Sequence, residues 1–245
     1  MVAAKRGHRV SLYEQEDRLG GQFHSAAIPP HKEDFLDIIR HLELMARRSG
    51  VEIRLNAKVT TEMVTASRPD VVILATGGIP LTVPFPGLDE TDWLLASDLL
   101  EGAAAVRSPS ALVIGGGLVG LETADFLSAK GKKVTLVEML PDTGADMDQL
   151  AKAMITKRLE KNLVTIHTNS RVVRLIRNAA IVQRGEDLIR LPVETVVVAV
   201  GVRANRELPD ALANSRLEVH VVGDAVEPRK ALDAIYEGFE IACGL

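Results

Sequence analysis

Residues 111–138 read ALVIGGGLVGLETADFLSAKGKKVTLVE, and this stretch decides the fold of the chain. The pattern predicts a buried strand, a glycine turn, a helix with an apolar stripe and a second strand that ends in an acid. Glycines spaced as Gly-x-Gly-x-x-Gly in such a unit are typical of dinucleotide-binding sites. Because the free N–H groups and the positive dipole end of the helix would face a phosphate, the stretch predicts a diphosphate at the helix start.

Three glycines and one acid carry this prediction. We expect Gly115 to permit the tight turn, Gly117 to let the backbone approach a diphosphate and Gly120 to let the helix pack close to the strand. Glu138 ends the second strand, where a carboxylate can accept hydrogen bonds from an adenosine ribose. Because a carboxylate repels a 2′-phosphate, Glu138 favours NAD(H) over NADP(H). The alternative is a glycine-rich turn that binds no ligand.

The composition excludes several classes of protein. Of the 245 residues, 47% are hydrophobic and 25% are charged, which is enough for a sizeable core. The net charge is -4 and the basic residues are scattered, so nucleic-acid binding is not expected. No apolar run approaches the ~20 residues of a membrane-spanning helix, and residues 1–10 do not resemble a secretion signal. The single cysteine, Cys243, excludes an internal disulfide and a cysteine metal cluster, so a reducing, cytoplasmic location is the default expectation.

The opening residues repeat part of the central stretch. Residues 7–14 (GHRVSLYE) match residues 131–138 (GKKVTLVE) without a gap, which pairs Glu14 with Glu138. At that offset, the three glycines of the central turn would have counterparts before Met1. We therefore expect the first copy to lack its leading strand and its phosphate loop, and to keep only the last turn of its first helix. The chain is accordingly expected to be part of a longer protein.

Periodicity predicts the remaining elements. Helices are expected at residues 32–48, 146–161 and 230–242, and strands at residues 51–55, 70–75, 164–168, 172–176, 180–184, 195–200 and 217–222. Strand 70–75 is apolar, which is typical of a strand buried on both faces of a parallel sheet. The turn at Asn178 predicts an antiparallel flap, and Trp93 is expected to pack in a proline-rich connection. Two helical stripes are expected to face the core: Met147, Leu150, Met154 and Leu159, and Leu232, Ile235, Tyr236 and Phe239.

Three segments carry a resemblance to known proteins: residues 75–78 (ATGG), residues 115–138 and residues 222–224 (VGD). Their order resembles that of the paired dinucleotide-binding flavoproteins, in which an NAD(P) domain is inserted into an FAD domain. Residues 7–22 and 223–235 are more closely similar to the C-terminal half of the NADH:flavin oxidoreductases typified by 2,4-dienoyl-CoA reductase and trimethylamine dehydrogenase. The resemblance implies an α/β fold with two Rossmann-like domains. The expected domains are an incomplete FAD-binding-like domain, residues 1–106 with 204–245, and an inserted NAD(P)-binding domain, residues 107–203.

The resemblance also implies which residues bind the cofactors. The FAD ligands would be Glu14 at the adenosine ribose, Gly21 and Gln22 at the diphosphate, Lys58 and Val59 at the adenine, Thr76 and Gly77 on the crossing strand, and Gly223 and Asp224 at the ribityl or diphosphate region. The nicotinamide cofactor would lie on the turn of residues 115–120, with its ribose at Glu138. Glu122 either faces the nicotinamide or is a first-turn acid that the helix dipole favours.

Members of this family carry an N-terminal barrel with FMN and an iron–sulfur cluster, and no such barrel is in this sequence. The resemblance therefore implies an NAD(P)H-dependent flavin oxidoreductase, in which FAD takes a hydride and passes electrons singly to that barrel. The alternative is a non-catalytic module that holds ADP or NAD. Because the first copy lacks its phosphate loop, we expect FAD to be bound weakly or lost. A disulfide reductase needs two nearby cysteines, and the six histidines are too dispersed to predict a metal site.

Overall fold

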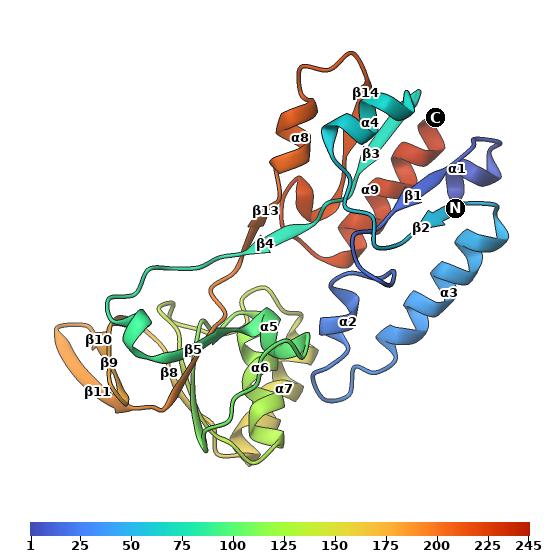
Figure 1. The fold of residues 1–245 in the computed structure, drawn as a ribbon. Coiled ribbons are helices and arrows are strands. Elements are labelled where there is room, and N and C mark those ends of the chain that lie inside the picture. Colours follow the sequence, from blue (N-terminus) through green and yellow to red (C-terminus); the bar gives the residue numbers. More distant parts are fainter. The chain divides into compact units, whose positions relative to one another are not determined.

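The computed structural model describes residues 1–245, which form two compact units (Figure 1). Unit 1 comprises Met1–Phe23, Leu36–Ile79 and Val202–Leu245, and unit 2 comprises His24–Phe35 and Pro80–Gly201. Both units contain parallel strands and helices, so the expected α/β class is confirmed. Residues 80–106, which the sequence analysis placed in the first domain, pack with unit 2 in the structure. Which cofactor each domain holds stays a prediction.

The core of unit 2 is a five-stranded parallel sheet. Its order is β5 (Asp92–Leu95), β12 (Thr195–Val198), β6 (Ser110–Ile114), β7 (Lys133–Val137) and β8 (Thr165–His167). Side chains of β6 alternate between two buried clusters, with Val113 in one and Leu112 in the other. The central strand is therefore buried on both faces, as its apolar sequence predicts.

Helices cover one face of this sheet and a flap covers the other. The helical face holds α5 (Ala96–Leu100), α6 (Leu118–Ala129) and α7 (Gln149–Lys161), and the opposite face holds η1 (Leu88–Glu90) and the antiparallel strands β9 (Ser170–Ile176), β10 (Ala179–Arg184) and β11 (Asp187–Pro192). The predicted flap is confirmed, although its third strand, β11, was not expected. Strand β5 was also not predicted, because prolines and polar residues surround it in the sequence.

The strands of unit 1 form separate pairs. Here β1 (Ser11–Tyr13) pairs in parallel with β2 (Glu52–Arg54), and β3 (Val71–Leu74) pairs in parallel with β14 (Glu218–Val221), but no strand joins the two pairs. In unit 2, β7 is the counterpart of β1, and it pairs with β6. Among the strands of unit 1, none pairs with β1 in the way that β6 pairs with β7. The short strands β4 (Gly78–Pro80) and β13 (Val202–Ala204) also pair with each other.

The helices outside unit 2's sheet are α1 (Val2–Lys5), α2 (Phe23–Ala26), α3 (Phe35–Arg48), α4 (Thr61–Ser67), α8 (Glu207–Leu212), η2 (Gly223–Ala225) and α9 (Ala231–Gly244). The single turn of α1 is what the repeat predicts for the end of a first helix. It packs on α9, while α4 and α8 pack on each other beside β3 and β14. None of these helices, nor any in unit 2, has the length and apolar character that crossing a lipid bilayer requires.

Both predicted helical stripes are wrong in part or in full. In α7, Leu159 is buried as predicted, but Leu150 and Met154 are exposed because Ile155 faces the core instead. In α9 the whole predicted stripe is exposed: Leu232, Ile235, Tyr236 and Phe239. The reason is that the only sizeable contacts of α9 are with α1 and η2, which are too short to cover a four-turn apolar face.

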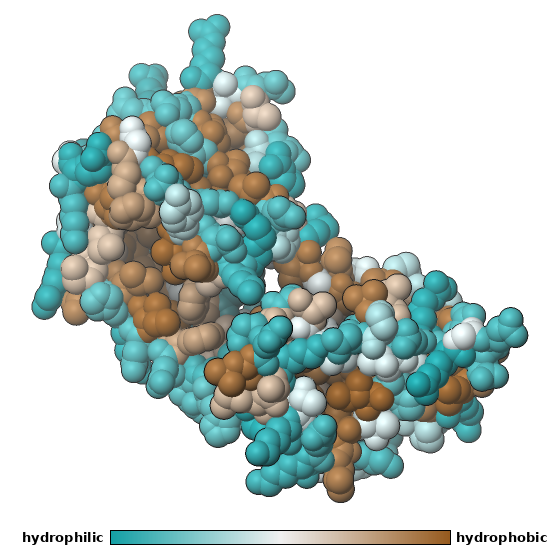
Figure 2. Space-filling view, turned by 180° about the vertical axis from the view of Figure 1, so that it is seen from behind, coloured by the Kyte–Doolittle hydropathy of each residue, from teal (hydrophilic) through white to brown (hydrophobic).

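Strand β3 also departs from the prediction that it is buried on both faces. Ile73 on this strand is exposed, because β3 pairs only with β14 and the remaining elements of unit 1 leave one face open. Figure 2 shows brown hydrophobic surface on unit 1, in the upper left of the view. Apolar periodicity thus identifies the apolar face of an element in unit 1, but it does not show whether another element packs on that face.

Candidate dinucleotide-binding site

The turn between β6 and α6 is built so that only glycine fits at two of its positions. Gly115 has a φ of 104°, and a Cβ atom there would overlap the carbonyl oxygen of Ala199. A Cβ atom on Gly120 would overlap the carbonyl oxygen of Gly115, so the first turn of α6 lies directly against the strand end. Gly117 is the N-cap of α6, and the nearest atom to a Cβ placed on it is an oxygen of the Asp146 carboxylate, 3.4 Å away. No backbone atom blocks an approach to Gly117, and the group that lies against it in the structure is the Asp146 carboxylate.

Gly116 is a further member of this turn that the motif spacing did not single out. A Cβ atom on it would lie 2.8 Å from Cγ2 of Thr143 and 2.9 Å from Cβ of Glu138. Its own N–H donates a hydrogen bond of 2.6 Å to Oε2 of Glu138. The run of three consecutive glycines was the signal that could have identified it.

Glu138 holds the two loops at the carboxyl ends of β6 and β7 together. The side chain is buried, and Oε1 accepts a second hydrogen bond, of 2.7 Å, from the N–H of Leu140. Each carboxylate oxygen keeps one lone pair beyond these two bonds, so Glu138 can still accept from a ligand hydroxyl. The carboxyl ends of adjacent parallel strands are where open α/β sheets bind ligands.

Asp146 is the second acid of the site, although the periodicity predicted that it begins a helix. It precedes α7, and both of its carboxylate oxygens accept from the N–H of Leu118, at 2.9 Å and 3.1 Å. An acid is favoured at this place because the N-terminus of α6 carries partial positive charge. Residues 118 and 146 are joined only by the fold, so no local sequence signal predicts the contact.

Glu122 lies one turn into α6, where it is 7% exposed and paired with Lys32. Lys32 belongs to the segment His24–Phe35 that packs with unit 2, and its ammonium lies 5.2 Å from the centre of the Phe35 ring. Burial raises the pKa of Glu122 above its ordinary value, and it outweighs the hydrogen bond and charge of Lys32, which lower it. The pair therefore places one cation and one buried acid beside the glycine turn.

This raised pKa predicts a pH-dependent stability. The folded state holds the proton of Glu122 more tightly than the unfolded state does, so the free energy of unfolding falls as pH rises from 4.5 through the folded pKa. We expect Glu122→Gln, measured against wild type, to gain stability at neutral pH and to lose that gain below pH 4.5 in urea titrations. Lys32→Ala removes the charge that opposes the effect of burial, so the free energy of unfolding should fall more steeply as pH rises. If Glu122→Gln were less stable than wild type at neutral pH, the effect of Lys32 on the pKa of Glu122 would outweigh that of burial.

In unit 1, the structure brings together three of the predicted FAD-binding segments. Nε2 of Gln22 donates to Oδ2 of Asp224 at 3.5 Å, and a Cβ atom on Gly77 would lie 3.9 Å from that same Nε2. The adjacent Thr76 donates from Oγ1 to the carbonyl oxygen of Asn205 at 3.2 Å. Residues far apart in sequence therefore meet in one polar cluster, and their role as FAD ligands stays a prediction.

The predicted adenosine-binding residues of unit 1 also lie together. The carbonyl oxygen of Glu14 accepts from the N–H of Ala57 at 2.8 Å, so β1 ends beside the loop that continues into Lys58 and Val59. The Glu14 carboxylate accepts from the N–H of Glu16 at 3.0 Å.

Two glycines of unit 1 that were predicted for the diphosphate and ribityl regions have positive φ angles. Gly21 has a φ of 47°, and a Cβ atom on it would have no neighbour within 4 Å. Gly223 has a φ of 64°, and its N–H donates to Glu237 at 2.7 Å.

The two predicted nucleotide sites differ in how many of the expected structural elements are present in the chain. Unit 2 supplies a strand, a glycine turn, a helix N-terminus and an acid at the adjacent strand end, which fits a dinucleotide. At the N-terminus of α6, the carboxylate of Asp146 accepts from the backbone N–H of Leu118. Unit 1 brings together the residues predicted for the adenosine ribose and for the ribityl region, but it has no strand and glycine turn like those of β6. Its residues therefore fit FAD only in part.

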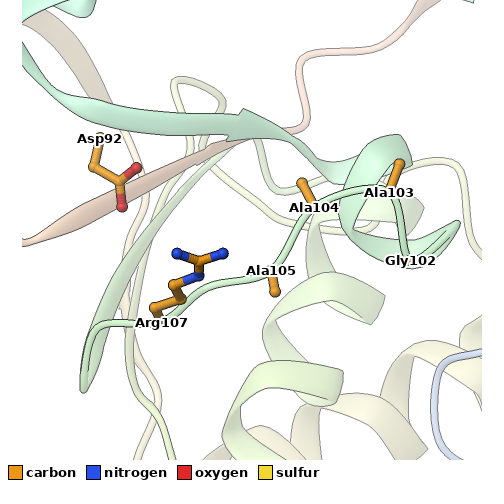
Figure 3. A pocket seen from close by; sticks show the side chains of 6 residues that line it. All are labelled: Asp92, Gly102, Ala103, Ala104, Ala105 and Arg107. Atoms are coloured by element: carbon orange, nitrogen blue, oxygen red, sulfur yellow. The ribbon is translucent and has the colours of Figure 1, made fainter.

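A pocket of about 490 Å³ lies elsewhere on unit 2 (Figure 3). It is lined by Asp92, Arg107 and residues 102–105, and Figure 3 shows the Asp92 and Arg107 side chains on either side of the same space. Asp92 begins β5 and Arg107 precedes β6, so the pocket is at the amino ends of the strands. The glycine turn follows the carboxyl end of β6, and the pocket is therefore separate from the candidate site.

Comparisons with known proteins agree with this geometry. The family model described as pyridine nucleotide-disulphide oxidoreductase matches residues 1–228. Similar curated proteins include an NADH oxidase of Thermoanaerobacter brockii, 37% identical over 99% of this chain and 38% of that protein, and a metal reductase of Desulforamulus reducens, 31% identical over 98% of this chain and 41% of that protein. The solved structure of a 2-naphthoyl-CoA reductase complex superposes with a TM-score of 0.93 at 26% identity, over 99% of this chain and 37% of that one. The chain thus spans about two fifths of the length of the curated relatives it matches.

Proposed function

Because the chain belongs to the pyridine nucleotide-disulphide oxidoreductase family, we propose that it is the nucleotide-binding part of an NADH-dependent flavoprotein oxidoreductase. Members of this family bind FAD and NAD(P), and the similar proteins include an NADH oxidase and reductases. A nicotinamide bound to this chain would supply a hydride, and a bound flavin would supply the means to pass electrons on singly. The observation that carries the proposal is the glycine turn with Glu138 at the adjacent strand end.

The residues of unit 2 bind and orient the dinucleotide in this proposal. Backbone N–H groups at the start of α6 donate to the diphosphate, with Gly117 giving it room to approach. Glu138 accepts hydrogen bonds from the ribose hydroxyls, and its charge disfavours a 2′-phosphate. Glu122 lies beside the nicotinamide, where Lys32 holds its carboxylate in place.

The Glu138 charge predicts a measurable preference between nucleotides. We expect Glu138→Gln to lower the dissociation constant of NADPH, relative to that of NADH, by about tenfold. The reason is that the substitution removes the repulsion between the Glu138 carboxylate and the 2′-phosphate. Isothermal titration with both nucleotides measures the ratio. The exposed Glu160 of α7 gives the control, since Glu160→Gln removes the same charge away from the turn. An unchanged ratio would mean that Glu138 does not contact the ribose.

In unit 1, we place the FAD adenosine at Glu14 with Lys58 and Val59, its diphosphate at Gly21, and its ribityl region at the Gln22, Thr76, Gly77 and Asp224 cluster with Gly223. No counterpart of the β6 turn supports the FAD diphosphate, so we propose that FAD is held weakly by this chain. The same observation favours a second candidate function, a non-catalytic module that holds ADP or NAD. Flavin absorbance that survives desalting would contradict weak binding.

The electron acceptor beyond FAD is also part of the proposal. The curated relatives extend well beyond the length of this chain, and we propose that electrons pass from FAD to a barrel domain carrying FMN and an iron–sulfur centre. The resemblance of residues 7–22 and 223–235 to the 2,4-dienoyl-CoA reductase type supports this arrangement. The final substrate would bind to that barrel.

Steady-state oxidation of NADH by the chain, with added FAD and a dye acceptor, distinguishes the two candidate functions. The oxidoreductase proposal predicts turnover that saturates with NADH and requires FAD. The passive module predicts that NADH and ADP bind without FAD-dependent turnover. Lack of binding by either nucleotide would contradict both.

A further inference from the structure

The start of α6 carries an anion that belongs to the chain itself. Both oxygens of Asp146 accept from the N–H of Leu118, at 2.9 Å and 3.1 Å, and Oδ2 lies 3.4 Å from where a Cβ atom of Gly117 would be. The carboxylate therefore covers the part of the backbone that is open to an approaching group. A carboxylate with two oxygens on a helix N-terminus makes the same kind of contact that a phosphate group makes there.

Two anions cannot use this N–H group at once. A diphosphate bound at the start of α6 would need the N–H of Leu118, and its charge would repel a carboxylate that stayed within a few ångströms. Glu138 does not compete in this way, because its oxygens accept from Gly116 and Leu140 instead. Asp146 is thus the one acid of the site whose place coincides with that of the diphosphate.

The loop that carries Asp146 allows the side chain to leave without disturbing the core. Between β7 and α7, Thr143 and Gly144 are buried, and the N–H of Gly144 donates to the carbonyl oxygen of Gly116 at 2.7 Å. Residues 145 and 146 are exposed, and α7 has its own N-cap in Asp148, which accepts from the N–H of Ala151. The anchor and the helix cap can both stay in place while the Asp146 carboxylate turns toward solvent.

We propose that Asp146 is a built-in competitor for the diphosphate, and that nucleotide binding displaces it from Leu118. The inference rests on the proposed nucleotide site at the start of α6 and names the residue that limits its affinity. In the free protein, Asp146 satisfies the N–H of Leu118. In the complex, the diphosphate takes over this hydrogen bond, and part of its binding free energy is spent on releasing the carboxylate.

The test compares Asp146→Asn with wild type by isothermal titration, using NADH, ADP and adenosine as the three probes. Removing the charged acceptor should tighten NADH and ADP binding by about tenfold, because hydrogen bonds to charged groups are the stronger class. Adenosine has no phosphate, so its affinity should not change. Asp142→Asn is the matched control, since Asp142 lies on the same loop but pairs with Lys152 and not with α6. The exposed position and similar shape of asparagine keep the fold intact, which Trp93 fluorescence verifies.

Each other outcome overturns the inference in a distinct way. If wild type and Asp146→Asn bind NADH and ADP equally, Asp146 does not compete, while the proposed nucleotide site stands. If Asp146→Asn binds them more weakly, Asp146 supports the ligand instead of opposing it. If adenosine or the Asp142→Asn control shows the same gain, the effect is not one of displacement at Leu118. If neither protein binds NADH or ADP, the proposed function fails together with the inference.

Discussion

Replacing Gly120 with alanine is expected to destabilise unit 2 by about 3 kcal/mol, the upper range for a side chain forced into a packed site. The added methyl group would overlap the carbonyl oxygen of Gly115, a backbone atom that cannot rotate away. Helix propensity alone predicts the opposite sign, a gain of about 1 kcal/mol for alanine in a helix. Separation of α6 from the end of β6 would also misplace the N–H groups at the helix start, so NADH binding should be lost as well.

The measurement is urea unfolding followed by circular dichroism and by the fluorescence of Trp93, the only tryptophan. Trp93 lies in β5 and packs against a core cluster of unit 2, so its signal reports on that unit. Gly238→Ala is the matched control, because Gly238 is inside α9 and a Cβ atom on it would have no neighbour within 4 Å. That variant should raise the free energy of unfolding of unit 1 by about 0.5 to 1 kcal/mol, which circular dichroism follows. Equal gains for both alanines would show that α6 does not pack closely against the turn.

Arg158→Ala should destabilise the same unit by about 3 kcal/mol, because it leaves a buried carboxylate without its partner. Asp125 on α6 is 1% exposed, and its Oδ2 accepts from Nε of Arg158 on α7 at 2.8 Å. The other oxygen, Oδ1, has no hydrogen-bond partner, so no second group can compensate for the loss. The pair joins the helix of the candidate site to its neighbour.

A second ion pair on α7 provides the control. Lys152 pairs with Asp142 at 2.5 Å, but the side chain of Asp142 is 70% exposed. Lys152→Ala should therefore cost at most about 1 kcal/mol in the same Trp93 unfolding experiment. Double substitution of Asp125 and Arg158 by Asn and Ala should recover part of the loss, since no charge is then buried. Similar costs for Arg158→Ala and Lys152→Ala would show that burial of Asp125 contributes little.

The nucleotide turn could be predicted from sequence because its determinants are local. The requirement for glycine at Gly115 and Gly120 arises from atoms of the same strand–turn–helix unit and of one neighbouring strand. The gap in unit 1 could be predicted for a related reason. The match of residues 7–14 with 131–138 identified β1 as a second strand, and a second strand without a first leaves its neighbours unpaired.

Contacts between distant segments could not be predicted in this way. Lys32 is 90 residues from Glu122, and Asp146 is 28 residues from Leu118, so neither pair leaves a periodic signal. The stripe of α9 shows a further limit, since periodicity reports that a face is apolar but burial depends on what packs against it. The edge strand β5 was missed because its four residues are flanked by prolines and acids.

The placement of a dinucleotide at the start of α6 is tested most directly by amide hydrogen exchange of the chain with and without NADH. We expect NADH to slow exchange at the N–H groups of Gly117 and Val119, and to leave the Gly238 amide in α9 unchanged. NADH that binds but protects only amides outside residues 115–122, or that protects none, would contradict this placement.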